Sequence, residues 1–123
     1  DICVTGPQYG GDPWRVAISD PSNPVSPLRL VALSQGALAS SGSYARCIEI
    51  EGVKYGHLLN PRTGYPFVGT AAATVLAEQC IVAGSLATIA LLKNSEAGQF
   101  LEQMQLPFLL IDQNRVIFDR LDL

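Results

Sequence analysis

The chain has no concentration of positive charge. Its eight Lys and Arg residues are scattered singly among eleven Asp and Glu, and the formal net charge is −3. Proteins that bind nucleic acid gain much of their affinity from clustered basic side chains, which displace counterions from the phosphates. We therefore expect no nucleic-acid partner.

Long apolar runs are also missing. Hydrophobic residues make up 48% of the sequence and charged residues 15%, which is apolar for a soluble protein. No uninterrupted run reaches the ~18 residues that a membrane-spanning helix needs. We expect a soluble domain with no membrane span.

Cysteine and histidine are scarce. Three cysteines, Cys3, Cys47 and Cys80, are odd in number and widely spaced, and no CxxC pair occurs. This pattern disfavours a zinc ribbon and a complete disulfide framework. Because free cysteine tends to be buried, we expect three buried thiols. His57 is the only histidine.

The length of 123 residues fits a single domain over residues 1–123. A chain of this size buries roughly two-thirds of the surface that its unfolded form exposes. Residues 1–4 have the composition of the end of a strand, with no initiator methionine or leader before them. We expect the chain to be part of a longer protein.

The spacing of apolar residues predicts an α+β fold, a mostly antiparallel sheet with two or more helices packed on it. Three hairpins are expected: residues 28–33 with 37–40, 44–50 with 53–59, and 108–111 with 115–118. Further strands are predicted over 14–18 and 70–77, a loop over 22–27, and helices over 78–93 and from an N-cap at Ser95 to residue 104 or 105.

Residues 40–66 contain most of the chemically interesting side chains. A Ser41-Gly42 turn precedes the second hairpin, and His57 lies near the end of its return strand. Asn60–Gly64 then combines a proline, a glycine, an arginine and a hydroxyl, a turn that can hold an anion. The alternatives are a simple connecting turn with a solvated Arg62, and a His57 that is a hydrogen-bonded structural residue.

The order of these motifs resembles the C-terminal portion of the FAD:protein FMN transferases (ApbE), formerly called thiamine-biosynthesis lipoproteins. Members of that family carry a Gly-Gly-acidic strand end, a Trp-led strand ending in a proline, a Ser-Gly-x-Tyr turn, a His-x-x-Asp-Pro-x-Thr-Gly-x-Pro turn and an Asp-x-x-x-Thr helix. The present chain shows, in the same order, Asp1-Ile2, a strand led by Trp14, Ser41-Gly42-Ser43-Tyr44, His57–Pro66 and Gly84–Thr88.

The resemblance implies a Mg²⁺-dependent transfer of FMN from FAD to a threonine of a flavoprotein acceptor subunit. It also implies a bacterial parent protein that is periplasmic and lipid-anchored. His57 becomes the catalytic candidate. The residues implied in flavin binding are Ser41, Gly42, Tyr44, His57, Leu58, Arg62, Thr63 and Gly64.

The chain departs from the family pattern at the metal site. Gly84 stands where the family has its metal-binding aspartate, so that Thr88 remains as the residual metal ligand. Thr88 could instead be a buried helical threonine bonded to a backbone carbonyl. Asn60 replaces an aspartate but can still close its turn through the side-chain oxygen.

The family's N-terminal half also has no counterpart here, and together these departures predict impaired or absent transfer. Two alternatives remain open. The chain could be a non-catalytic relative that binds a flavin or a partner. It could also be an assembly module whose open sheet edge is completed by another chain or by self-association.

Overall fold

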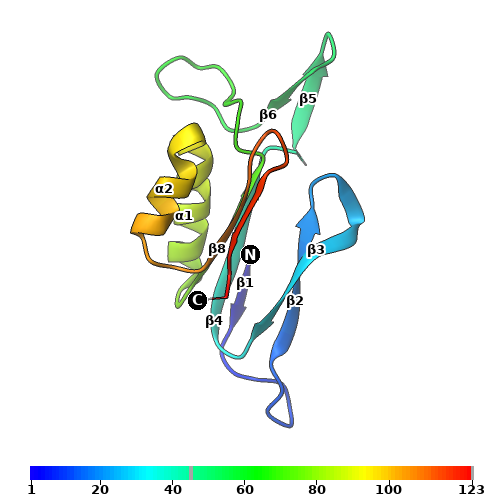
Figure 1. The fold of residues 1–123 in the computed structure, drawn as a ribbon, viewed down its shortest axis with the longest axis vertical. Coiled ribbons are helices and arrows are strands. Elements are labelled where there is room, and N and C mark those ends of the chain that lie inside the picture. Colours follow the sequence, from blue (N-terminus) through cyan, green and yellow to red (C-terminus); the bar gives the residue numbers. More distant parts are fainter. Residues whose placement is uncertain (45, 123) are drawn as a thin grey trace.

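A five-stranded antiparallel sheet forms the middle layer of the computed structural model, which describes residues 1–44 and 46–122 (Figure 1). The strand order is β1-β4-β7-β8-β9, so β1 and β9 are its edges. The strands are β1 (Ile2–Val4), β4 (Gly36–Gly42), β7 (Ala72–Ala77), β8 (Phe108–Ile111) and β9 (Ile117–Arg120). The α+β prediction is confirmed.

Both faces of this sheet are covered, because successive residues of its central strands are apolar. Side chains alternate between the two faces of a strand. Leu38 and Leu109 therefore join one core, while their neighbours Ala39 and Leu110 join the other. The helices pack on the second core, and a two-stranded hairpin packs on the first (Figure 1).

The helical layer consists of α1 (Cys80–Lys93), a short 3-10 turn η1 (Asn94–Glu96) and α2 (Ala97–Gln103). Ala83, Ala87 and Ala90 have no exposed surface and form a small-residue face that lets α1 lie close to β4 and β7. The long predicted helix is confirmed. The prediction of Ser95 as an N-cap is wrong, because Ser95 lies inside η1 and Glu96 occupies the N-cap position of α2.

The hairpin of β2 (Trp14–Asp20) and β3 (Asn23–Leu33) corrects one sequence-based pairing. The predicted hairpin of residues 28–33 with 37–40 is wrong, because β3 pairs with β2 while β4 pairs with β1 and β7. Gly36, at φ +95°, lies where the chain passes from the hairpin layer into the central sheet. The residues between β3 and β4 have the composition of a hairpin turn. The burial of β3 side chains between the two layers nevertheless pairs β3 with β2 instead of β4.

The turn between β2 and β3 is also tighter than predicted. The backbone N–H of Ser22 donates to Asp20 Oδ1 at 2.7 Å, and β3 begins at Asn23, inside the stretch expected to be a loop. The hydrogen bonds from Ser22 hold the pKa of the Asp20 carboxyl below its ordinary value. The carboxylate thus closes the turn that starts β3 early.

The other two predicted hairpins are confirmed with shorter or shifted strands. β5 (Cys47–Ile50) and β6 (Val53–Gly56) pair across Glu51 and Gly52, which both have positive φ, as a type I′ turn requires. Ala45, part of that prediction, lies outside the described residues. β9 starts two residues later than expected, because Asp112 Oδ1 accepts hydrogen bonds from the N–H groups of Asn114 and Val116.

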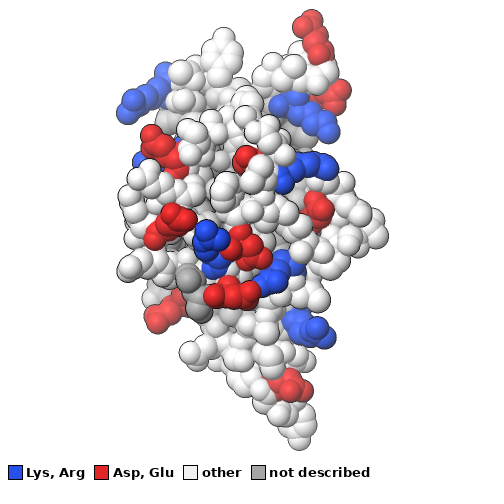
Figure 2. Space-filling model, viewed as in Figure 1, with Lys and Arg blue, Asp and Glu red and all other residues white. Residues whose placement is uncertain are grey.

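Charged side chains of both signs are interspersed on the face shown in Figure 2. Neither α1 nor α2 has the length and apolar character that crossing a membrane would take. The expectation of three buried thiols is wrong. Cys3 is exposed on the edge strand β1, and Cys47 and Cys80 are half-buried, all three as free thiols.

Candidate functional site

A cavity of about 540 Å³ lies beside β4, between the β2 strand, the base of the β5–β6 hairpin and α1. Its floor includes apolar side chains of the first core, such as Val16, Leu38 and Ile111. Six residues implied by the sequence also line it: Ser41, Gly42, Tyr44, His57, Leu58 and Thr88. The fold thus brings together segments from three parts of the chain.

Two pairs of hydroxyl groups fix the β4 side of the cavity. Ser40 Oγ lies 2.8 Å from Thr74 Oγ1 across the β4–β7 pair. Ser41 Oγ lies 2.9 Å from Thr88 Oγ1, which joins β4 to α1. The suggested bond from Thr88 to a backbone carbonyl is therefore replaced by a bond between two side chains. This bond holds both hydroxyl groups at the cavity wall.

The Ser-Gly-x-Tyr turn is shaped by close contacts at two glycines. A Cβ on Gly42 would lie 2.5 Å from Cε1 of Tyr44, so the tyrosine ring packs directly over the glycine. A Cβ on Gly56 would lie 2.8 Å from the Cβ of Ser43. The turn consequently sits against the end of β6, and this contact directs Tyr44 and His57 toward the same cavity.

The turn after His57 does not reach the cavity. Asn60 closes it as predicted, since Asn60 Oδ1 accepts a hydrogen bond from the Arg62 N–H at 2.9 Å. The N–H of Gly64 donates to the Asn60 carbonyl at 2.8 Å. Arg62, Thr63 and Gly64 are exposed and lie outside the lining of the cavity. Their role in flavin binding stays a prediction.

The residues around position 84 do not fit a Mg²⁺ ion. Hard cations take several oxygen ligands, mostly carboxylates. Gly84 offers no side-chain oxygen, and the Thr88 hydroxyl is bonded to Ser41. In the described part of the chain, no group of three or more His, Cys, Asp and Glu side chains could hold a metal. We derive no catalytic step that uses a metal here.

Two charged residues of the cavity lining were not among the site residues predicted from the sequence. Asp1 lies next to Gly84, where its Oδ2 would be 3.8 Å from an added Cβ. Arg46 lies two positions after Tyr44, and the strand predicted over 44–50 would put the two side chains on the same side. In the structure both residues lie in bends that line the cavity. That period-two spacing was the available signal for Arg46. Nothing local to Asp1 reveals that α1 lies beside it.

Comparison with known proteins identifies the family. The sequence pattern of the ApbE family matches residues 1–110. The chain belongs to the ApbE family. The FAD:protein FMN transferase of Vibrio cholerae is 35% identical over 114 residues, a match that covers 90% of this chain and 34% of that protein. The FAD:protein FMN transferase of Rhodobacter capsulatus is 36% identical, with 65% of this chain and 15% of that protein covered.

Solved structures of ApbE proteins share the fold. The ApbE protein of Thermotoga maritima has a TM-score of 0.82 at 30% identity, covering 93% of this chain and 38% of the other. The Vibrio cholerae flavin transferase ApbE has a TM-score of 0.72 at 31% identity, covering 93% and 37%. A histidine-to-glycine variant of the Vibrio cholerae protein also matches. The chain spans little more than a third of the length of these ApbE proteins.

Proposed function

We propose that this chain forms the flavin-binding C-terminal part of an FAD:protein FMN transferase scaffold and that its own transfer of FMN is impaired. One observation carries the proposal. Six residues implied by the ApbE resemblance surround one cavity of about 540 Å³. Small-molecule sites commonly measure roughly 300–1,000 Å³, so the volume suits a flavin ring system.

The impairment follows from the missing carboxylate on α1. Transfer from a pyrophosphate needs charge neutralisation on the phosphates, which a bound metal ion normally supplies. A metal ion contributes several kcal/mol to transition-state stabilisation, and ~1.4 kcal/mol corresponds to a tenfold rate change. Gly84 has no side-chain oxygen and the Thr88 hydroxyl is bonded to Ser41, so α1 offers no carboxylate to bind a metal ion. We expect transfer to be slower by a factor of roughly a thousand or more.

The residues that remain can still bind and orient a ligand. The apolar floor can take the flat face of a ring, while the Ser41 hydroxyl and the Gly42–Tyr44 turn form one wall. His57 is exposed toward the cavity and is the candidate for accepting the proton of an acceptor hydroxyl. The acceptor itself, a threonine of a flavoprotein subunit, is part of the proposal.

A second candidate is a relative that binds a flavin or a protein partner without catalysing transfer. The bond between Ser41 and Thr88 favours it, because both hydroxyl groups satisfy each other without a metal. Under this candidate, the cavity would bind FAD with the same affinity whether or not Mg²⁺ is present. A periplasmic, lipid-anchored parent fits either candidate and stays a prediction.

Restoring the missing carboxylate tests the proposal. Among the described residues, the atoms within 4 Å of a Cβ added at Gly84 are Ala39 Cβ and Asp1 Oδ2, each at 3.8 Å, so the Cβ of Gly84→Asp has room. Its carboxylate would face Asp1, with Thr88 one helical turn along, and supply oxygen ligands for a hard cation. FAD affinity is measured by fluorescence titration with and without Mg²⁺. Ser85→Asp is the control, because it adds the same charge about 100° further around α1.

We expect wild-type protein and Ser85→Asp to bind FAD equally well in both conditions. Gly84→Asp should bind FAD at least about tenfold more tightly with Mg²⁺, a change of ~1.4 kcal/mol. Metal-independent binding by all three proteins would favour the second candidate. Tighter wild-type binding in Mg²⁺ would refute the impairment, and no FAD binding by any of them would refute the flavin site.

A further inference from the structure

Arg46 lies at the open end of the β5–β6 hairpin, directly beside His57 in the pairing order. The last pair of the hairpin is Cys47 with Gly56, so the residues that follow outward on the two strands are Arg46 and His57. Both line the cavity beside β4. Cys47 and Gly56 line a different hollow, together with Lys54. Arg46 and His57 each lie in a bend just outside the paired strands, and there they line the cavity instead of that hollow.

Arg46 is also a cation without a carboxylate partner. The ion pairs found among residues 1–44 and 46–122 are made by Arg29 and Lys93, and none of them includes Arg46. The cavity lining contains the carboxylate of Asp1, which lies beside Gly84 of α1 and forms no ion pair with Arg46 among the described residues. A guanidinium has five N–H donors in a planar fork that matches phosphate and carboxylate oxygens. At Arg46 this fork is open to a ligand.

Arg62, the arginine that the sequence suggested for anion binding, is placed differently. It lies in the exposed turn closed by Asn60 and outside the cavity lining. The two arginines are sixteen positions apart, and the hairpin fold brings Arg46 instead of Arg62 to the cavity. Arg62 is therefore the competing candidate for the phosphate, and the test compares the two arginines directly.

The geometry points to Arg46 as the residue that binds the phosphate of a flavin nucleotide in this cavity. The inference rests on the proposed function and adds an orientation to it. The ring lies over the apolar floor of Val16, Leu38 and Ile111, and the phosphate chain extends toward the hairpin base. Arg46 supplies bidentate hydrogen bonds to the phosphate and selects nucleotide forms of the flavin over riboflavin.

The test compares Arg46→Ala, Arg46→Lys and Arg62→Ala with the wild type. Dissociation constants for riboflavin and FMN are measured by flavin fluorescence at two salt concentrations. Arg46→Ala should weaken FMN binding at least tenfold and leave riboflavin binding unchanged. Arg46→Lys should recover part of the FMN affinity, because it keeps the charge but loses the fork. Arg62→Ala should behave as the wild type, and the salt dependence for FMN should fall only in Arg46→Ala.

Two results would overturn the assignment. One is an equal loss of riboflavin and FMN affinity in Arg46→Ala, and the other is a loss in Arg62→Ala as large as that in Arg46→Ala. If the wild type binds neither flavin, the proposed function fails, and a second probe still decides the role of Arg46. Inorganic pyrophosphate is then titrated while the Arg46 Nε–H resonance is followed by NMR. A saturable shift that is larger than that of Arg62 supports the assignment, and no such shift overturns it.

Discussion

At the scale of single residues, Gly69 is the described glycine at which an added Cβ would come closest to another atom, and that atom belongs to Asn94. Gly69 has φ +146°, and a Cβ there would lie 1.5 Å from Asn94 Oδ1. Asn94 follows the end of α1, and its Nδ2 donates to the Val68 carbonyl at 2.8 Å. Its own carbonyl accepts a bond from Thr70 Oγ1 at 3.1 Å. These bonds tie the segment that follows the site turn to the end of α1.

We predict that Gly69→Ala destabilises the protein by about 1–3 kcal/mol, because alanine rarely adopts this backbone conformation and its Cβ would collide with Asn94. Asn94→Gly keeps the positive φ of position 94 and removes the colliding side chain. Urea unfolding of the two single variants and the double variant forms a thermodynamic cycle. Gly69→Ala should cost less in the Asn94→Gly background. Additive costs would show that the collision contributes nothing.

Single residues also show what the sequence could reveal about the site. Ser41, Gly42, Tyr44 and His57 are parts of local motifs, and they do line one cavity. Arg62 looked like the anion-binding residue because it sits in a glycine- and proline-containing turn. The choice of Arg46 over Arg62 depends on where the base of the β5–β6 hairpin lies relative to β4 and on the position of α1. Contacts between distant segments set both, and local patterns do not encode them.

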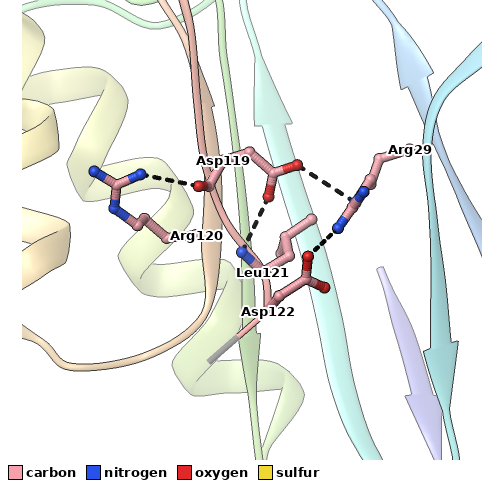
Figure 3. Close-up of polar contacts among 5 residues, drawn as sticks. All are labelled: Arg29, Asp119, Arg120, Leu121 and Asp122. Carbon is pink, nitrogen blue, oxygen red and sulfur yellow. Dashed lines mark hydrogen bonds and ion pairs between the residues drawn. The ribbon is translucent and has the colours of Figure 1, made fainter.

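At the scale of elements, the β2–β3 hairpin is held against the sheet by two kinds of interaction. Arg29 on β3 forms ion pairs with Asp119, at 3.4 Å, and with Asp122 near the C-terminus (Figure 3). Val16, Ile18 and Leu33 bury their side chains between the layers. Arg29 and Asp119 are each more than a third exposed, so solvent screens their attraction. The apolar contacts should therefore dominate.

We predict that Arg29→Ala costs less than about 1 kcal/mol of unfolding free energy, as exposed ion pairs typically do. Ile18→Ala should cost about 2–4 kcal/mol, because Ile18 is only 5% exposed and its truncation leaves a cavity. Chemical denaturation of both variants measures the difference. The order would be reversed if the ion pairs, and not the apolar core, fixed the hairpin.

Strand pairing was predicted correctly where the turn residues alone specify it. It was predicted wrongly where one strand has two possible partners. Glu51-Gly52 specifies a two-residue turn on its own, so the β5–β6 hairpin followed from the sequence. Ser34-Gln35-Gly36 also has the composition of a hairpin turn, which would pair β3 with β4. β3 pairs instead with the preceding strand, β2. Leu33 is buried between the layers, and this tertiary burial outweighs the turn signal.

At the scale of the whole molecule, both faces of the central sheet are covered, but its β1 edge has no further strand paired to it among the described residues. β1 is an edge strand of three residues, and within the part of the chain that the structure describes it pairs with β4 alone. On the neighbouring surface of α1, Ile81 is 72% exposed and Ile89 is 38% exposed. An unpaired edge beside apolar side chains favours association with another polypeptide. This chain covers 34% of the length of the Vibrio cholerae protein.

We predict that the 123-residue chain self-associates through this surface. The sedimentation coefficient should rise with protein concentration, and Ile81→Lys should reduce that rise because it places a charge within the apolar contact. Val25→Lys is the matched control, since Val25 is 94% exposed on the β2–β3 hairpin, away from β1 and α1. Sedimentation velocity over a hundredfold range of concentration measures the effect. A wild type that stays monomeric throughout, or an equal response of the two lysine variants, would show that apolar exposure on α1 does not drive association.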